Sequence, residues 1–378
     1  MQTPPTNRVS IPTPVRAVLI VGLLYLFLVG VKLLEGGIKG LGSDIQATLF
    51  DGVSNPIAGL CVGILGTVLV QSSSVSTSTI VGLVAAGVID VSSAVPMIMG
   101  ANIGTTVTNT LVSLAHLRKT DEFRLAFTAA TMHDFFNLMA VAALLPLELA
   151  TRFLSNSAEW IADALTGSQE LGGSFDSPIK GAVKWLASIV EDGVDAVVSA
   201  ETFAAVITIV IGLAFIFFTL AFITRNMRLL VADRIERSLN AALARSGLIG
   251  MAVGMIVTIS VQSSSITTSI LIPIVASGVL LVRNAFPITL GANVGTTVTA
   301  LLAALGAGAV DGLTIAVTHT LFNLTAIALF YPLPRIRYFP VQAAEWLARQ
   351  AVQRKRWAVG YVFGLFVILP VLGIVVFR

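Results

Sequence analysis

The sequence predicts an all-α integral membrane protein, and three observations lead to this fold class. The 378 residues are 56% hydrophobic and 11% charged, less than half of the roughly 25% charged residues found in soluble domains. Two long stretches, 53–89 and 247–282, contain no charged residue. A long segment of the sequence also occurs twice. These features favour apolar helices that cross a bilayer.

The composition excludes several classes of function. A net charge of only +3 gives no concentrated basic surface, so we expect no nucleic-acid partner. The single cysteine, Cys61, excludes an intramolecular disulfide and a cysteine-based zinc site. The sequence has no glycine-rich nucleotide loop, no His/Cys metal motif and no nucleophile–base motif. We therefore expect neither an enzyme nor a bound cofactor.

The first apolar stretch, residues 15–34, is expected to be a retained membrane-spanning helix. It follows a polar, proline-rich segment and is too long for the apolar part of a signal peptide.

The internal repeat is the most informative feature. Residues 59–108 align with residues 250–299 without a gap, at an offset of 191, with 26 identities in 50 positions. Both copies contain Gln-Ser-Ser-Ser and, further on, Gly-Ala-Asn-(Ile/Val)-Gly-Thr-Thr. The match resumes at an offset of 186, where His133, Phe136 and Asn137 align with His319, Phe322 and Asn323. The duplication indicates two structural copies of one unit.

Segment lengths predict a re-entrant hairpin in each copy, over residues 56–89 and 248–281. Apolar runs shorter than the ~20 residues of a spanning helix flank the polar tips Gln71–Ser74 and Gln262–Ser265. Each hairpin is therefore expected to consist of two half-helices that meet near the middle of the bilayer. Such a tip is tolerated only where protein covers it or where it lines a cavity.

The segments after the hairpins, 94–116 and 285–306, are long enough to cross the bilayer. Their Gly-Ala-Asn-x-Gly-Thr-Thr motifs predict a break in each helix. The first repeat is expected over 1–150 and ends in a span over 125–150, and an external acidic loop follows over 151–200. The second repeat is expected over 201–331, with spans over 203–224 and 312–331 and an interfacial helix over 228–245. The remaining residues, 332–378, are expected to form an interfacial helix and a final span.

Charge placement predicts the orientation. Basic residues cluster near residues 118–124, 225–245 and 335–356, whereas the loop over 151–200 holds seven acidic and three basic residues. By the positive-inside rule, the basic clusters and the N-terminus are expected to be cytoplasmic and the acidic loop external. Three crossings separate the two hairpins, so the second repeat is expected to be inverted relative to the first. Inverted repeats with broken helices are typical of secondary transporters. A total of seven crossings would leave the C-terminus outside.

The hairpin tips combine groups that bind anions with groups that bind cations. The half-helix after each tip offers free backbone N–H groups and the positive end of its dipole to an anion. Hydroxyl and carbonyl oxygens at the same tips suit sodium. The alternative is that the serines and threonines only join helices by hydrogen bonds.

The absence of charge around the tips is also informative. No Lys or Arg lies in either hairpin or in the expected broken helices, so a buried anion would need to enter with cations. Asp134 is the one acidic residue well inside an apolar segment, and we expect it in a cation site, the alternative being a structural pair. His133 and His319 are expected to serve in helix packing.

At these residues the sequence resembles the type II sodium-dependent phosphate cotransporter family. The resemblance rests on the duplicated Gln-Ser-Ser-Ser motifs, on "GANIGTTVTNT" and on "DEFRLAFTAATMHDFFN". It covers most of residues 58–147 and 248–329. Animal members have cysteines and glycosylation sites in the external loop, and this loop has neither, which fits a bacterial-type member.

The resemblance implies a transporter of inorganic phosphate driven by sodium, in the cell membrane. The implied phosphate-binding residues are Ser72, Ser73, Ser74, Ser263, Ser264, Ser265, Asn102 and Asn293. The implied sodium-binding residues are Gln71, Gln262, Thr105, Thr106, Thr296, Thr297, Asp134 and Asn137. Sodium is the only metal expected, as the coupling ion. The partners are phosphate, sodium and the lipid bilayer, with the oligomeric state open and a homodimer as one option.

The sequence is compatible with three functions. The first is sodium-coupled phosphate symport by alternating access. The second is an anion channel or a transporter that is uncoupled or coupled to protons. The third is a membrane phosphate sensor that does not transport. Two closed tips that meet form a binding site more readily than a pore, and both sets of tip residues are present, so symport is favoured.

Overall fold

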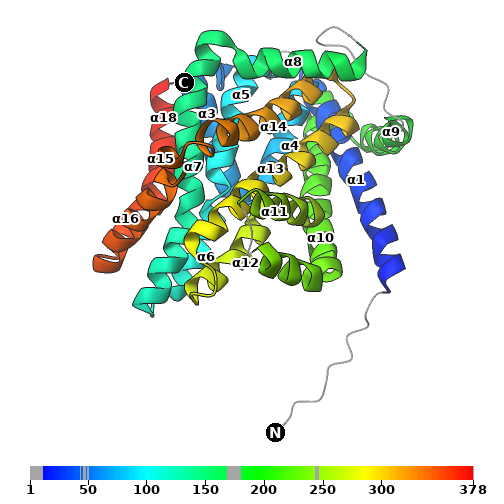
Figure 1. The fold of residues 1–378 in the computed structure, drawn as a ribbon. Coiled ribbons are helices and arrows are strands. Elements are labelled where there is room, and N and C mark those ends of the chain that lie inside the picture. The colour runs from blue at the N-terminus through cyan, green and yellow to red at the C-terminus, as the bar shows by residue number, and fades with distance from the viewer. Residues whose placement is uncertain are drawn as a thin grey trace.

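The computed structural model is built from helices, and the residues it describes contain no β-strand (Figure 1). It describes residues 12–42, 51–167, 180–242 and 247–377, together with 44, 45 and 48. Within these residues, six helices are long and apolar enough to cross a membrane, and four shorter apolar helices accompany them. The prediction of an all-α integral membrane protein is therefore confirmed.

The first copy of the repeat begins with a long helix and a pair of short ones. The helix α1 is followed by α3 and α4, and then by α5 and α6, which are separated at Thr105–Thr106. The long helix α7 completes this half. The bounds are Thr13–Lys39 for α1, Pro56–Val70 for α3, Ser73–Ala85 for α4, Val91–Gly104 for α5, Val107–Ser113 for α6, Leu114–His116 for a 3-10 turn, and Thr120–Thr151 for α7.

The second copy repeats this order with one clear difference. The helix α13 runs without interruption through Gly291–Thr297, so the expected break in residues 285–306 is wrong for this copy. Its first turn also contains Arg283, which is exposed and lies over the ring of Tyr338. The bounds are Glu201–Ala242 for α10, Gly247–Val261 for α11, Ser264–Ala276 for α12, Val282–Ala307 for α13 and Val310–Phe330 for α14.

Two further regions differ from expectation. The residues expected to form a separate interfacial helix over 228–245 continue α10 as far as Ala242, and residues 243–246 lie outside the described part of the chain. The acidic loop over 151–200 contains two amphipathic helices, α8 (Phe153–Thr166) and α9 (Lys180–Val197). The helix α8 lies across the top of the bundle in Figure 1.

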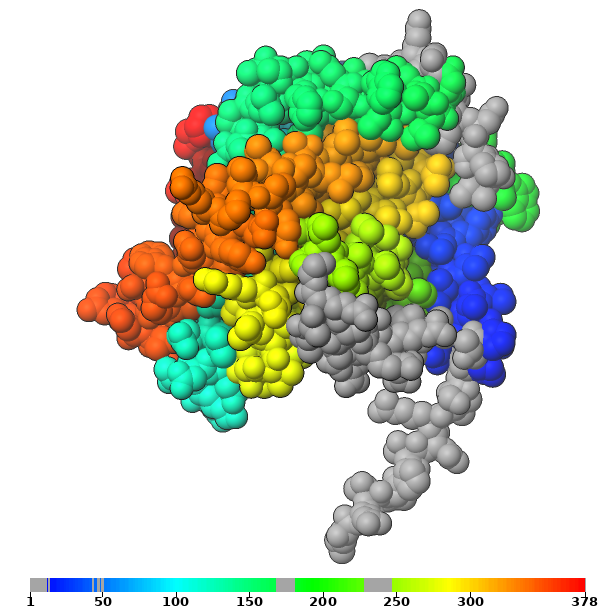
Figure 2. Space-filling model, in the orientation of Figure 1, coloured from blue at the N-terminus to red at the C-terminus, as the bar shows by residue number. Residues whose placement is uncertain are grey.

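The C-terminal segment contacts the first copy. It comprises α15 (Pro334–Arg337), α16 (Phe339–Gln353), α17 (Arg356–Phe363), a π-helical turn (Gly364–Ile368) and α18 (Leu369–Phe377). The helix α16 packs along α7, where Leu347 and Ala348 join a hydrophobic cluster with Phe123 and Phe127. Figure 2 shows α16 projecting beside the start of α7. The end of α18 lies on the same side of the bundle as α8, and the start of α1 on the opposite side (Figure 1).

The two copies pack in the same way because their glycines occupy matching positions. A Cβ on Gly63 would lie 2.0 Å from the Met97 carbonyl oxygen, and one on Gly254 would lie 1.9 Å from the Ile288 carbonyl oxygen. Both distances are far below van der Waals contact. Only glycine therefore lets α3 approach α5, and α11 approach α13, this closely.

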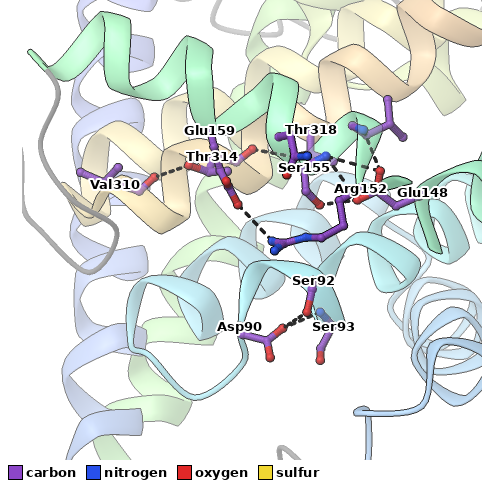
Figure 3. Close-up of polar contacts among 12 residues, drawn as sticks. Asp90, Ser92, Ser93, Glu148, Arg152, Ser155, Glu159, Val310, Thr314 and Thr318 are labelled. Carbon is purple, nitrogen blue, oxygen red and sulfur yellow. Dashed lines mark hydrogen bonds and ion pairs between the residues drawn. The ribbon is translucent and has the colours of Figure 1, made fainter. Parts of the chain in front are cut away.

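A buried carboxylate fixes the corner between α7 and α8 (Figure 3). Glu148 is 5% exposed and accepts hydrogen bonds from the backbone amides of Leu154, at 2.7 Å, and Ser155, at 3.2 Å. The hydroxyl of Ser155 also donates to it. Arg152 at the corner has a left-handed backbone and pairs with Glu159 at 3.2 Å. The carboxylate thus satisfies amides at the start of α8 and complements its dipole.

Candidate functional site

The polar tips of the two hairpins fold in the same way. Gln71 and Gln262 each end a helix in the left-handed conformation, with φ of 56° in both cases. Ser72 and Ser263 follow in an extended conformation and cap the next helix, each accepting a hydrogen bond from the backbone amide three residues on. The left-handed residue reverses the chain, and the capping serine starts α4 or α12 immediately afterwards.

The two tips also contact each other. The hydroxyl of Ser74 donates to the backbone carbonyl of Gln262 at 3.3 Å. On the other side of the second tip, Ser265 donates to the carbonyl of Thr105 at 3.5 Å, where α5 and α6 are interrupted. Residues far apart in sequence therefore meet at the centre of the protein. The N-termini of α4 and α12 lie close to this contact.

A cavity of about 260 Å³ lies between the two tips and α10. Both tips contribute polar side chains to its wall, and α10 contributes an apolar side with one hydroxyl. The lining residues are Val70, Gln71, Ser72, Ser74, Val75, Phe217, Leu220, Ala221, Thr224, Gln262 and Ser263. No Lys, Arg, Asp or Glu is among them.

Each tip glutamine is held by a threonine that the sequence analysis did not single out. Thr108 donates to the side-chain oxygen of Gln71 at 3.1 Å, and Thr299 donates to that of Gln262 at 2.9 Å. Both threonines lie 37 residues beyond their glutamine and correspond to each other in the repeat alignment. The duplication itself was therefore the signal that could have identified them.

The surroundings of the two glutamines differ. Gln71 is exposed, whereas Gln262 is 8% exposed. Only the first copy has Asn109 in the following helix, where it donates to Thr268 at 2.7 Å and accepts from Ser269 at 3.1 Å. The site is therefore built from similar halves with unequal burial.

Not all of the residues proposed for phosphate lie at the cavity. Ser72, Ser74 and Ser263 line it. Ser73 and Ser264 are buried beside it, and the Ser264 hydroxyl has no hydrogen-bond partner among the described residues. Ser265 is turned toward the Thr105 carbonyl.

Asn102 and Asn293, by contrast, lie in a separate buried cluster of four asparagines. Asn293 donates to the side-chain oxygens of Asn137, at 3.0 Å, and Asn323, at 2.7 Å. Asn323 donates to the Asn102 side chain at 3.4 Å, and Asn137 donates to the Asn102 backbone carbonyl at 2.8 Å. Each copy supplies two members, so the cluster joins the two copies of the repeat.

The residues proposed for sodium do not all lie together. Gln71 and Gln262 line the cavity, and Asn137 belongs to the asparagine cluster. The hydroxyls of Thr105, Thr106, Thr296 and Thr297 donate to carbonyls of their own helices, at 2.8 to 3.2 Å. A hydroxyl that donates in this way keeps its lone pairs free to accept or to ligate a cation.

Asp134 lies in α7 beside the interruption between α5 and α6. It is 0% exposed, and the hydroxyl of Tyr361 donates to its Oδ2 at 2.8 Å. The hydroxyls of Thr106 and Thr110 lie near this carboxylate, but they donate to the backbone carbonyls of Ile103 and Thr106. Its Oδ1 has no hydrogen-bond partner among the described residues. No cluster of three or more His, Cys, Asp or Glu side chains that could hold a metal occurs in the described part of the chain.

The chain is similar to known phosphate transport proteins over almost its whole length. Sodium-dependent phosphate transport protein 2A is 32% identical in Rattus norvegicus, over 93% of this chain and 66% of its own length, and 33% identical in Ovis aries, over 95% and 67%. Sodium-dependent phosphate transport protein 2B of Homo sapiens is 30% identical, over 94% and 64%. The chain thus spans about two thirds of the length of these relatives.

The same relationship is found at the level of families. Residues 26–161 and 215–335 match the Na+/Pi-cotransporter family, and these two ranges include both hairpins. No solved structure shows a significant match to the chain. With both copies of the repeat covered, the chain belongs to the Na+/Pi-cotransporter family.

Proposed function

We propose that this chain carries inorganic phosphate together with sodium ions across the cell membrane, and that its two repeats lie inverted in the bilayer and work by alternating access. The observation that carries the proposal is the cavity between the hairpin tips. Amide and hydroxyl groups of both tips form one part of its wall, apolar side chains form the other part, and no charged side chain lines it.

The chemistry of the tips supports an anion as one substrate. The helices α4 and α12 begin at the cavity with Ser72 and Ser263 as their caps. The first amides of a helix have no acceptor within the helix and carry its positive end charge, which attracts an anion such as phosphate. Hydroxyls in the same place add donors without adding charge.

The lack of a basic side chain supports cations as the second substrate. Transfer of an uncompensated polyanion out of water is costly. Oxygen atoms of Gln71, Gln262 and the threonines of the repeat motifs are suitable ligands for a hard cation. Asp134 supplies a buried carboxyl group beside the interruption of α5 and α6. Sodium bound there would compensate the phosphate charge, which couples the two fluxes.

Uptake of radiolabelled phosphate into proteoliposomes tests the proposal. An inward sodium gradient is expected to drive accumulation of phosphate above its external concentration, and replacement of sodium by choline is expected to abolish it. Uptake that is unchanged in choline but sensitive to a proton ionophore would show proton coupling instead. Flux that only follows the phosphate gradient would show an uncoupled pathway.

A further inference from the structure

We propose that Tyr361 positions the carboxylate of Asp134, so that the C-terminal segment after the second repeat forms part of the cation site. The inference rests on the proposed function, because it assumes that Asp134 binds the coupling ion. It assigns a role to a helix, α17, that lies beyond residue 335, where the match to the family ends.

The carboxylate of Asp134 differs from the other two buried carboxylates in the described part of the chain. Glu35 pairs with Lys32 at 2.7 Å and with Lys39 at 2.8 Å. Glu148 is used by amides at the start of α8. Asp134 has neither a cationic partner nor a helix terminus, and only its Oδ2 is occupied, by the hydroxyl of Tyr361. The pattern indicates a carboxylate in which one oxygen accepts a hydrogen bond and the other is left to bind an ion.

Oδ1 of Asp134 has oxygen atoms nearby that could also ligate an ion. Thr106, between α5 and α6, and Thr110, in α6, lie near the carboxylate, and their hydroxyls donate to backbone carbonyls, which leaves their lone pairs for a cation. A single hydroxyl donor on Oδ2 limits rotation of the carboxylate about its last bond. Limiting that rotation presents Oδ1 in one direction before the ion arrives, and such preorganisation raises affinity.

Tyr361 is well suited to hold a neighbour in place, because aromatic side chains surround its ring. The ring stacks on Phe135 with centroids 6.0 Å apart, and it meets Phe127 edge-on at 6.5 Å and Phe366 edge-on at 6.2 Å. Packing of α16 and of Ala358 in α17 against α7 positions the start of α17. These ring contacts hold the Tyr361 side chain, and therefore its hydroxyl, in one position.

The corresponding position of the second repeat has no such arrangement. At the offset of 186, Asp134 aligns with Thr320, whose hydroxyl donates to the carbonyl of Ala316 within its own helix. The support from the C-terminal segment is thus specific to the copy that carries the acidic residue.

The test compares Tyr361→Phe with the matched control Tyr25→Phe in proteoliposomes. Both substitutions keep the ring and remove one hydroxyl donor; the Tyr25 hydroxyl donates to the carbonyl of Ala182, at 2.7 Å, outside the site. For Tyr361→Phe, the sodium concentration that gives half-maximal uptake is expected to rise roughly tenfold, the usual effect of losing a hydrogen bond to a charged group. The phosphate concentration for half-maximal uptake at saturating sodium is expected to stay unchanged. Tyr25→Phe is expected to change neither value.

A binding measurement separates failure of this inference from failure of the proposed function. The rise in melting temperature caused by sodium is measured in detergent for Tyr361→Phe, Asp134→Asn and the double variant. If Asp134→Asn keeps the full sodium effect, Asp134 is no cation ligand and both proposals fail at this residue. If Asp134→Asn loses it and Tyr361→Phe keeps it, only the role of Tyr361 is refuted.

Two further outcomes decide the remaining cases. The double variant is expected to match Asp134→Asn, because the hydroxyl acts only through the carboxylate; additive losses would overturn the inference. Equal shifts in the sodium and phosphate dependences of Tyr361→Phe would likewise overturn it, because they would show general damage to packing.

Discussion

Replacement of Ser264 by alanine is expected to have opposite effects on the free protein and on phosphate binding. The side chain is 2% exposed, and its hydroxyl has no hydrogen-bond partner among the described residues. A buried hydroxyl without a partner costs about 1–3 kcal/mol of desolvation. Ser264→Ala removes that cost, so the free protein is expected to keep or gain stability. If phosphate pairs with this hydroxyl, the same change weakens phosphate binding about tenfold or more.

Ser74→Ala, at the first tip, is a comparison in which the hydroxyl already has a partner; the repeat counterpart of Ser74 is Ser265. The Ser74 hydroxyl already donates to the Gln262 carbonyl, so its removal is expected to lower the stability of the free protein by about 0.5–1.5 kcal/mol. Melting temperatures of both variants in detergent, without and with phosphate at fixed sodium, give the two quantities separately. Proteoliposome uptake then gives the apparent phosphate affinity of each variant.

A Ser264→Ala protein that melts at a lower temperature without phosphate, and that binds phosphate as well as the unmodified chain, would contradict this expectation. That result would show a hydroxyl used in packing and not in binding. A loss of phosphate affinity without a loss of stability is the pattern expected if phosphate pairs with the Ser264 hydroxyl.

Three further outcomes are expected. Gly254→Ala places a Cβ 1.9 Å from the Ile288 carbonyl oxygen, so α11 and α13 must separate; a loss of about 1–3 kcal/mol is expected, measured as a lower melting temperature and yield. Thr299→Val leaves the buried Gln262 oxygen without its donor and should lower stability by about 1–3 kcal/mol, more than the equivalent change at the exposed first tip. Burial raises the pKa of Glu191 on α9, so its ionised form is disfavoured in the folded protein. The unfolding free energy should therefore fall as pH rises through this raised pKa, and a glutamine at this position should remove that part of the pH dependence, measured by melting at several pH values.

The duplicated sequence predicted the membrane fold and the place of the tips, because composition and segment length act locally. Short apolar runs around a polar tetrad cannot span a bilayer, and α3 and α4 meet at Gln71 and Ser72. It did not predict that only one of two nearly identical motifs interrupts its helix. The surroundings of the two motifs differ. Thr106 of the first copy lies near Asp134, whereas the residue aligned with Asp134 in the second copy is Thr320.

Contacts between residues that are distant in sequence could also not be predicted. Tyr361 lies 227 residues after Asp134, in a segment that has no counterpart in the repeat. The family resemblance implies Asn102 and Asn293 as phosphate ligands, yet the structure places both in an asparagine cluster, and neither lines the cavity. The repeated motif indicates that both residues are buried, but it does not identify their neighbours. The neighbours are set by the packing of α5, α7, α13 and α14.

That asparagine cluster has a consequence for how such a chain could arise. Two of its hydrogen bonds, Asn293 to Asn137 and Asn323 to Asn102, run from one copy of the repeat to the other. In a half-length ancestor with one copy, the side-chain oxygens of Asn137 and Asn102 would have lacked these donors. A second molecule of the ancestor could have supplied them. The fused chain still carries that mutual dependence, and its halves are expected to be stable as a pair but not apart.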